Sequence, residues 1–275
     1  MRVKGLGHRH LVGVISREMG ERNIRRPTIL DAGCGDGRLL RLLSDTLPCS
    51  LSGFDSPNYG LQATERLGAQ ARAEVDIRFT HPDGRWPFED SQFDIVVSNQ
   101  VCEHVIDFKL FCAENYRVLK PGGIGVHTFP LRHFIIEPHM HLPLVHRIRD
   151  HQLRSWSIKQ LSIAGVGIYK AHAKPAEVDL DTFAQAHADY ARTYTTYRTW
   201  REVCDELHRH GFRVSYRHTS SLVQRGLWRL VGSERPGRPA PAILEAALFP
   251  ILRSFVSCTL LVEKTQDYRF NWAVH

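Results

Sequence analysis

Residues 29–37 read Ile29-Leu30-Asp31-Ala32-Gly33-Cys34-Gly35-Asp36-Gly37, three glycines directly after a short apolar run. The run Thr28–Ala32 predicts a buried strand, and Leu39–Leu43 predicts a helix just beyond the glycines. Glycine has no Cβ atom, so the backbone of this turn can approach a ligand closely. The first N–H groups of the following helix have no partner within the helix. The stretch therefore predicts a strand, a ligand-binding turn and a helix.

The same alternation of apolar strands and helices continues along the chain. We expect an N-terminal helix over 8–22, a helix over 103–119, an amphipathic helix over 199–210 and an apolar helix over 241–255. Further strands are expected over 51–54, 75–79, 93–98, 124–129, 212–217 and 257–263, with a turn at Pro121-Gly122-Gly123. Such alternation predicts an α/β fold with a parallel sheet that helices cover on both faces.

One stretch interrupts this pattern. Residues 130–197 are rich in histidine, proline and aromatic residues and show weak periodicity. We expect a single domain over 1–275, in which 130–197 form an insertion after the fifth strand. Because the carboxyl ends of parallel strands form the ligand-binding edge of such sheets, this insertion is expected to be a lid that binds substrate.

The charges in the glycine turn indicate what it binds. A dinucleotide site needs G-x-G-x-x-G, and here position 38 is arginine, so the third glycine of that pattern is missing. Asp31 and Asp36 would repel a phosphate but attract an ammonium group. S-adenosylmethionine carries an ammonium and a sulfonium and no phosphate, so the turn favours this cofactor over NAD. An ordinary glycine-rich turn and an NAD-dependent oxidoreductase are the alternatives.

Two later stretches complete the expected cofactor site. Asp55 follows Gly35 by about the 20 residues expected of an acid that accepts hydrogen bonds from ribose hydroxyls, and Ser56 comes next. His81-Pro82-Asp83-Gly84 could contact adenine through the Asp83 carboxylate and the next N–H group. The alternative for Asp55 is a turn or cap residue, and Pro-Asp-Gly is also a common turn.

These motifs together resemble a known family. Three further stretches follow the glycine turn in order: Trp86-Pro87-Phe88, then the stretch from Phe93-Asp94-Ile95-Val96-Val97-Ser98-Asn99 to Glu103-His104-Val105, and finally Arg117-Val118-Leu119-Lys120-Pro121-Gly122-Gly123. Over Thr28–Phe129 the chain resembles the class I S-adenosylmethionine-dependent methyltransferases, a group with many small-molecule enzymes. The resemblance implies a Rossmann-like, seven-stranded sheet whose last strand is antiparallel. It also implies cofactor contacts at Asp31, Gly33, Gly35, Asp55 and Asp83. The wider expected set adds Cys34, Asp36, Gly37, Ser56, Gly84 and Asn99. The segment between Asp83 and Pro87 is about one residue shorter than usual in the family, which weakens the expected adenine contact.

Three histidines are the candidate catalytic residues. His104 lies just beyond the fourth strand, and His139 and His141 lie in the polar part of the loop that leaves the fifth strand. Imidazole titrates near neutral pH and suits removal of a proton from a hydroxyl acceptor. Glu137, His139 and His141 could instead bind a metal, but no further acid that would orient the histidines is evident, so no metal is expected. Without a catalytic role, His104 would serve in packing and the two loop histidines would simply be exposed to solvent.

The expected acceptor is a small or medium-sized molecule, through a hydroxyl of a sugar or another metabolite. The loop around Glu137-Pro138-His139 and Leu142-Pro143 is similar to loops of uncharacterised methyltransferases from polysaccharide-type bacterial gene neighbourhoods, which supports that choice. A catalytically inactive binding module with the same fold is an alternative.

Other partners are less favoured. Nucleic acid is not expected, since Asn99-Gln100-Val101-Cys102 replaces the Pro-Pro-aromatic turn of amino-group DNA methyltransferases. The net charge is +7, but lysine and arginine are spread along the chain. The 241–255 helix could lie on a bilayer, although we expect it to pack on the sheet. The six cysteines form no C-x-x-C pair, and neither a signal peptide nor a membrane span is evident, so we expect a cytoplasmic protein of undetermined oligomeric state.

Overall fold

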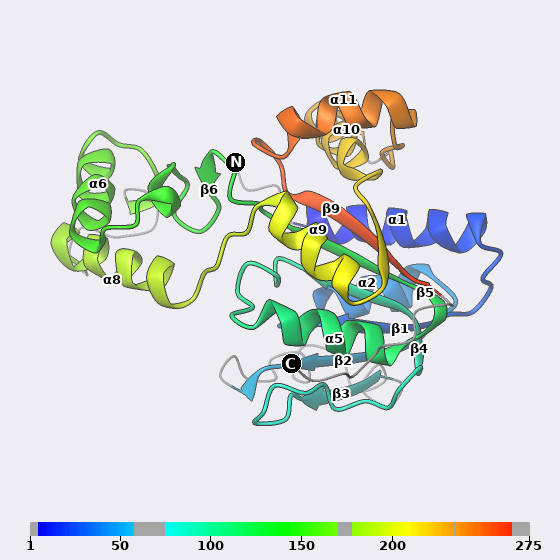
Figure 1. The fold of residues 1–275 in the computed structure, drawn as a ribbon. Helices are drawn as coiled ribbons and strands as arrows, with labels where there is room; N and C mark the ends of the chain where they lie inside the picture. The colour runs from blue at the N-terminus through cyan, green and yellow to red at the C-terminus, as the bar shows by residue number, and fades with distance from the viewer. Residues whose placement is uncertain (1–4, 58–74, 170–177, 234, 266–275) are drawn as a thin grey trace.

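A seven-stranded sheet forms the centre of the molecule (Figure 1). The computed structural model describes residues 5–57, 75–169, 178–233 and 235–265. The strand order is β3-β2-β1-β4-β5-β9-β8, and every neighbouring pair is parallel except those that involve β9. The predicted mostly parallel sheet with an antiparallel last strand is therefore confirmed. The strands are β1 (Thr28–Ala32), β2 (Ser50–Asp55), β3 (Val75–Phe79), β4 (Phe93–Asn99), β5 (Leu119–Phe129), β8 (Phe212–Ser215) and β9 (Cys258–Lys264).

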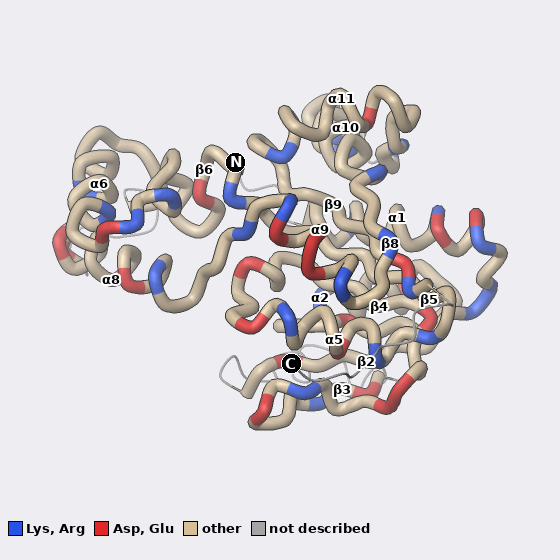
Figure 2. Tube along the Cα trace, in the orientation of Figure 1, with Lys and Arg blue, Asp and Glu red and all other residues tan. Residues whose placement is uncertain are grey.

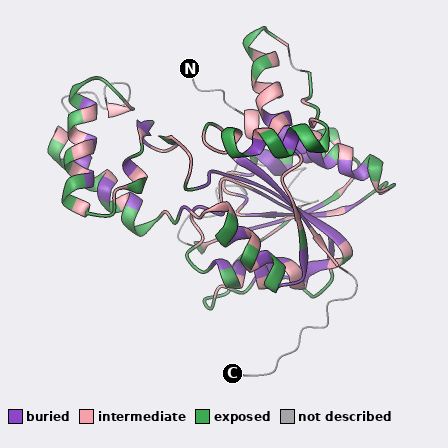
Figure 3. Cartoon of the chain, turned by 45° about the horizontal axis from the view of Figure 1, so that its top comes forward, coloured by how far each residue is buried: buried purple, intermediate pink, exposed green. Residues whose placement is uncertain are grey.

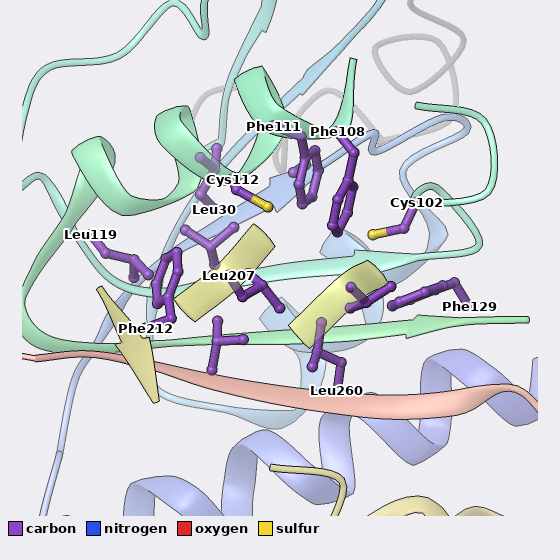
Figure 4. Close-up of a cluster of buried hydrophobic side chains, with 14 of the residues drawn as sticks. Leu30, Cys102, Phe108, Phe111, Cys112, Leu119, Phe129, Leu207, Phe212 and Leu260 are labelled. Carbon is purple, nitrogen blue, oxygen red and sulfur yellow. The ribbon is translucent and has the colours of Figure 1, made fainter. Parts of the chain in front are cut away.

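Helices cover both faces of this sheet. On one face, α1 (Leu6–Glu21) and α2 (Arg38–Thr46) share a buried apolar cluster with alternate residues of β1, β4 and β5. On the other face, α5 (Phe108–Val118) and α9 (Trp200–Arg209) cover the remaining strand residues. Figure 4 shows Phe108 and Phe111 of α5 and Leu207 of α9 in this second cluster. Central strands buried on both faces explain why their sequences are almost continuously apolar.

Two local features differ from the sequence prediction. The helix after β4 begins at Phe108, five residues later than expected, because the Asp107 side chain caps it by accepting a hydrogen bond from Leu110 N at 2.9 Å. The expected turn at Pro121–Gly123 lies within β5 as an irregularity, where the pairing with β4 passes from Phe93–Leu119 to Ile95–Ile124. Both changes leave the order of elements as predicted.

The insertion contains more regular structure than its sequence indicates. It holds the short pair β6 (Ile136–Glu137) and β7 (Leu142–Pro143), the 3-10 turn Val145–Arg147, and helices α6 (His151–Ile163) and α8 (Leu180–Thr193). The two helices pack together around a separate apolar cluster that includes Ile158 and Ala188. Figures 1 and 3 show this lobe beside the edge of the sheet where β5 ends, and Figure 3 colours several of its residues as buried.

The C-terminal part adds two helices near β9, the first beside α1 and the second reaching Trp200 of α9 through Phe249. α10 (Thr219–Leu230), which the sequence analysis missed, contacts α1 and β9, and α11 (Ala242–Leu252) packs on α10. Only Glu245 and Phe249 of α11 are buried. The expectation that this helix packs its apolar face on the sheet is therefore wrong, because most of that face points outward. Among the described residues, no helix is both long enough and apolar enough to cross a membrane.

Candidate active site at the carboxyl edge of the sheet

The glycine turn after β1 has the conformation that its sequence requires. Gly33, Gly35 and Gly37 have φ angles of 77°, 51° and 72°, a region that side chains with a Cβ rarely adopt. A Cβ on Gly33 would lie 2.6 Å from a methyl carbon of Val101. The N–H groups of Gly33 and Cys34 donate to the Phe54 carbonyl at 2.9 and 3.0 Å, which holds the turn against the end of β2.

Acidic side chains surround this turn. Asp31 is 2% exposed, and burial, followed by the charges of Asp55 and Asp36, raises its pKa to about 8. Asp36 forms an ion pair with Arg38 at 2.9 Å. Neither Asp31 nor Asp55 pairs with a described lysine or arginine. Among the described residues neither carboxyl group thus has a cationic partner, and a bound cation would favour their ionised forms.

Asp55 is held at the end of β2 by two backbone hydrogen bonds. Gly35 N donates to its Oδ2 at 2.6 Å and Ser56 N to its Oδ1 at 2.7 Å. Burial raises the pKa of Asp55, and these two hydrogen bonds oppose that effect. The carboxylate is thus fixed directly beside the glycine turn, as expected of a residue that accepts ribose hydroxyls.

A pocket of about 410 Å³ opens beside these acids. Five of the predicted site residues line it: Gly33, Asp55, Ser56, Gly84 and His104. The rest of its wall is mostly apolar and contains no predicted site residue. These lining residues are Ala32, Phe54, Thr80, Trp86, Val101, Val105, Ile106, Asp107, Leu110 and Phe111. The only sequence signal for Leu110 and Phe111 was their place within the helix expected over 103–119.

The other predicted cofactor residues do not line this pocket, and Asp31 is one of them because its side chain is buried. Cys34, Gly35, Asp36 and Gly37 belong to the turn itself, and Gly37 precedes α2 as its N-cap residue. Asp83 is exposed, and its carboxylate accepts a hydrogen bond from Arg85 N at 3.0 Å. The short segment before Pro87 turns tightly here, with Gly84 N donating to the His81 carbonyl, so Gly84 faces the pocket and Asp83 does not.

Asn99 lines a second pocket, of about 510 Å³, on the other side of the strand ends. This pocket lies between the start of α1, the ends of β4 and β5, and α10. The Oδ1 atom of Asn99 is buried and has no hydrogen-bond partner among the described residues. Asn99 therefore does not share the pocket that contains Asp55.

Two of the three candidate catalytic histidines meet beside the first pocket. His104, on the turn after β4, and His139, from the inserted lobe, have their Nε2 atoms 3.2 Å apart. His104 Nδ1 donates to the Tyr194 carbonyl at 2.7 Å, because a carbonyl can only accept. Burial lowers the pKa of His104, which favours a neutral ring with a free electron pair on Nε2.

A buried carboxylate orients His139. Glu137 Oε1 accepts hydrogen bonds from His139 Nδ1 at 2.6 Å and from the Tyr197 hydroxyl at 2.7 Å. Its Oε2 accepts from the N–H groups of His139 and Met140 at 2.9 and 2.6 Å. Although burial raises the pKa of Glu137, these bonds lower it overall, so the carboxylate is ionised. Glu137 is the orienting acid that sequence reasoning did not identify.

Glu103 also belongs to this cluster, whereas His141 does not. The Glu103 side chain is 1% exposed, and one of its oxygens lies within 4.8 Å of ring nitrogens of both His104 and His139. His141 is exposed at the turn between β6 and β7, with a φ angle of 56°. The structure thus brings together Glu103, His104 and His139 and leaves His141 outside their group.

Comparison with known proteins agrees with this architecture. A family model described as a methyltransferase domain matches residues 30–126. The chain is 36% identical over 107 residues to a probable S-adenosylmethionine-dependent methyltransferase of Mycolicibacterium smegmatis, covering 38% of each chain. It is 30% identical over 119 residues to a ubiquinone biosynthesis O-methyltransferase of Ruegeria pomeroyi, covering 43% of this chain and 47% of that one.

The matching segments thus span less than half the length of these curated relatives. Among solved structures, a chain described as a methyltransferase, in a complex with the Haloferax volcanii Trm112 methyltransferase activator, has a TM-score of 0.51 and 18% identity. That likeness covers 95% of this chain and 93% of the other, and it concerns the fold alone.

Proposed function

We propose that this member of the class I S-adenosylmethionine-dependent methyltransferase family, matched over residues 30–126, transfers a methyl group from S-adenosylmethionine to a hydroxyl of a small or medium-sized acceptor. One observation carries the proposal. Asp55 lines a pocket beside a positive-φ glycine turn, Asp31 is buried next to the same turn, and neither carboxyl group has a described basic partner. A cofactor with an ammonium group and ribose hydroxyls supplies what both carboxylates lack.

The residues present fit such a cofactor. Asp31 would balance its ammonium group, and Asp55 would accept hydrogen bonds from its ribose hydroxyls. The apolar wall formed by Trp86, Leu110 and Phe111 suits an aromatic base. Because Gly84 and not Asp83 faces the pocket, the adenine contact would fall to the backbone of this turn.

When bound, S-adenosylmethionine supplies a methyl group on a sulfonium, which is already electrophilic. The protein must then align the acceptor oxygen with that methyl carbon and exclude water. As the oxygen attacks, its proton must leave, and His104 Nε2 carries the free electron pair that can accept it. His139 lies against His104 and comes from the lobe, so residues 130–197 would contribute both to proton removal and to acceptor binding.

The acceptor class rests on the site and on the relatives. The name of the Ruegeria relative specifies methyl transfer to oxygen, whereas that of a Schizosaccharomyces pombe relative specifies a sterol C-methyltransferase. The choice of a hydroxyl acceptor, such as a sugar or another metabolite, therefore rests mainly on His104. Figure 2 shows acidic and basic residues interspersed along the described part of the chain, a distribution that gives no support to a nucleic-acid acceptor. All six cysteines are free thiols, which supports our proposal that the reaction takes place in the cytoplasm.

Ligand binding followed by acceptor screening tests this function. Calorimetry should detect binding of S-adenosylhomocysteine and no binding of NAD. Incubation with methyl-labelled S-adenosylmethionine and panels of hydroxylated metabolites should then label a product. Binding of NAD alone would favour an oxidoreductase, and cofactor binding without any labelled product would favour an inactive binding module.

Three histidine variants test the proposed proton acceptor once an acceptor is known. A general base contributes about 10²–10⁴-fold to a reaction. His104→Ala or His139→Ala should therefore reduce turnover by about that factor and leave cofactor affinity nearly unchanged. His141→Ala reports on the same loop at an exposed position. If all three variants keep turnover within about threefold, no imidazole removes the proton and positioning alone explains catalysis.

A further inference from the structure

We infer that Glu103, His104 and His139 form a binding site for a divalent transition-metal ion between the turn after β4 and the inserted lobe. The three side chains each offer one ligand atom, and these atoms all lie within 4.8 Å of one another. Two imidazoles and a carboxylate are a common donor set for zinc and for non-haem iron.

The separation of the two imidazoles fits a shared ion. Two nitrogens bound at about 2.0–2.1 Å to a tetrahedral ion lie about 3.3–3.4 Å from each other. His104 Nε2 and His139 Nε2 are 3.2 Å apart. The two ring nitrogens thus need almost no movement to bind the same ion.

The Nδ1 atom of each ring already has the kind of hydrogen-bond partner that metal-binding histidines have. His104 Nδ1 donates to the Tyr194 carbonyl at 2.7 Å, and His139 Nδ1 lies 2.6 Å from the Glu137 carboxylate. Such bonds fix the tautomer and direct Nε2 toward a metal. Glu137 is itself held by Tyr197 and by two backbone N–H groups, so this support is rigid.

Glu103 provides an independent observation. Its side chain is almost fully buried, and neither carboxylate oxygen has a hydrogen-bond partner in any other described residue. A buried ionised carboxylate without a balancing charge is strongly unfavourable, and a protonated one would still lack a hydrogen-bond partner here. A hydrogen bond between the two imidazoles would explain their contact but would leave Glu103 unexplained, whereas a shared cation accounts for all three side chains.

The inferred ion deepens the proposed function and, in this respect, rests on it. His104 also lines the pocket of Asp55, so the ion would lie beside the place where the acceptor must enter. A metal ion lowers the pKa of a bound hydroxyl. Because the ion would use the Nε2 electron pair of His104, it would replace this imidazole as the group that promotes proton loss. The acceptor hydroxyl would then lose its proton to solvent, and its oxygen would bond to the methyl carbon while the electrons of the C–S bond remain on sulfur.

Metal titration of the full chain tests the site without cofactor or acceptor. Protein dialysed against a chelator should bind one equivalent of Zn²⁺ in competition with a chromophoric chelator. Co²⁺ should give the visible absorption of a four- or five-coordinate nitrogen and oxygen site. Glu103→Gln and His139→Ala should each weaken Zn²⁺ binding at least tenfold, and Glu137→Gln should weaken it about 10–100-fold. The control is His151→Ala, a lobe histidine that pairs with Asp189, and it should bind Zn²⁺ within threefold of wild type.

Circular dichroism and thermal melting of each variant separate loss of metal from loss of fold. Zn²⁺ binding weaker than about 100 µM by wild-type protein, or equal binding by wild type and folded Glu103→Gln, would overturn the inference. Since this titration involves no methyl transfer, a protein that binds Zn²⁺ tightly but never binds S-adenosylhomocysteine would refute the proposed function and leave the metal site standing.

A second inference comes from the outer surface of α10 and α11. Several large apolar side chains there point to solvent, among them Ile243 at 88% exposure, Leu230 at 78%, Val231 at 73% and Phe255 at 63%. The one ionisable side chain of α11, Glu245, is buried and accepts hydrogen bonds from Ser220. The solvent-facing side of α11 therefore has no polar side chain, which is unusual for a helix exposed to water.

We propose that this surface docks onto an anionic lipid membrane. Charge complementarity favours that partner over an apolar protein face, because residues 219–255 carry five arginines and only two acids, of which Glu245 is buried. Arg235 and Arg238, in the loop between the helices, are exposed. An apolar helix face with nearby arginines is suited to lie in a bilayer interface. The pocket that contains Asn99 is lined by Leu227 and Leu230 of the same surface, so docking would bring it next to lipid.

Vesicle sedimentation tests the docking. Wild-type protein should sediment with vesicles of phosphatidylcholine and phosphatidylglycerol, less with phosphatidylcholine alone, and less at high salt. Ile243→Asp combined with Ile251→Asp should reduce binding at least tenfold. The matched control is Ile163→Asp on α6, at an isoleucine that is 53% exposed, and it should bind as wild type does. Equal vesicle binding by wild type and all variants would refute the proposal. It would also be refuted if the wild-type protein formed a dimer that did not bind vesicles and if the double variant were monomeric.

Discussion

Replacing Asp31 by asparagine keeps the shape of the side chain and removes a charge that the protein buries beside two other acids. With a pKa near 8, Asp31 is about nine-tenths protonated at pH 7 before a ligand binds. An ammonium group placed against it favours the ionised form. Cofactor binding at pH 7 should therefore release close to one proton, and affinity should rise about tenfold from pH 6 to pH 7.

The same carboxyl group makes a prediction about stability. The folded pKa of Asp31 is raised above its unfolded value near 3.9, so its contribution is fully present below about pH 4 and is lost as pH rises toward 8. The loss amounts to about 1.4 kcal/mol per pH unit in that window. When the pH is raised from 5 to 7, the wild type should therefore lose about 2–3 kcal/mol of unfolding free energy that Asp31→Asn does not lose.

Calorimetry with S-adenosylhomocysteine in two buffers of different ionisation enthalpy counts the released proton, and urea unfolding at pH 5 and pH 7 gives the stability difference. Asp31→Asn should bind this ligand roughly ten- to a hundredfold more weakly at pH 7, and its affinity should no longer depend on pH. Asp45→Asn, at an exposed α2 position paired with Arg41, is the control and should change neither quantity. Wild-type affinity in Asp31→Asn, together with no proton release by wild type, would refute the pairing of Asp31 with the cofactor.

Three further outcomes follow from the structure. Asp55→Ala should weaken S-adenosylhomocysteine binding by about 1.5–3 kcal/mol in calorimetry, and a value within twofold of wild type would place the ribose elsewhere. Gly33→Val should lose cofactor binding and stability together, because its φ angle is 77° and its Cβ would meet Val101; wild-type affinity would contradict this account of the turn. Glu18 is buried, which raises its pKa, but hydrogen bonds from His218 and Arg217 lower the pKa overall to about 2. The stabilisation by the Glu18 carboxylate is therefore present above about pH 4.5 and is lost as the pH falls toward 2. In urea unfolding, Glu18→Gln should lower the free energy of unfolding by roughly 3 kcal/mol at pH 7 but by much less at pH 3.

The sequence predicted the sheet and the glycine turn because their signals are local. An apolar strand, glycines that need positive φ and an acid about 20 residues later are all visible within Thr28–Asp55. The lobe gave no comparable signal. The buried face of α8 is made largely of alanines such as Ala184, Ala188 and Ala191, and its partners Met140 and Ile158 come from other elements. Such a face contributes little to a periodicity judged by large apolar residues.

The histidine cluster could not be derived from spacing alone. His139 and His141 are close in sequence, which suggested that they act together, yet the left-handed backbone at His141 leaves that side chain exposed. The true neighbour of His139 is His104, 35 residues earlier in the chain. Only the return of the lobe to the turn after β4 brings them into contact, and this return is a tertiary feature.

The turn after β4 connects the two halves of the proposed site. Val101 packs against Gly33 of the cofactor turn, and three residues later His104 faces both the pocket and the lobe. The lobe in turn contacts this segment through the Tyr194 carbonyl, which accepts from His104, and through the Thr196 N–H, which donates to the Glu103 carbonyl. Directly after the lobe, Arg198 donates to the carbonyls of Cys102 and Val105. A displacement of the lobe would therefore move His104 relative to the cofactor pocket. If the three-residue site binds a metal, that ion would join the lobe to this turn, so metal binding and cofactor binding should each strengthen the other.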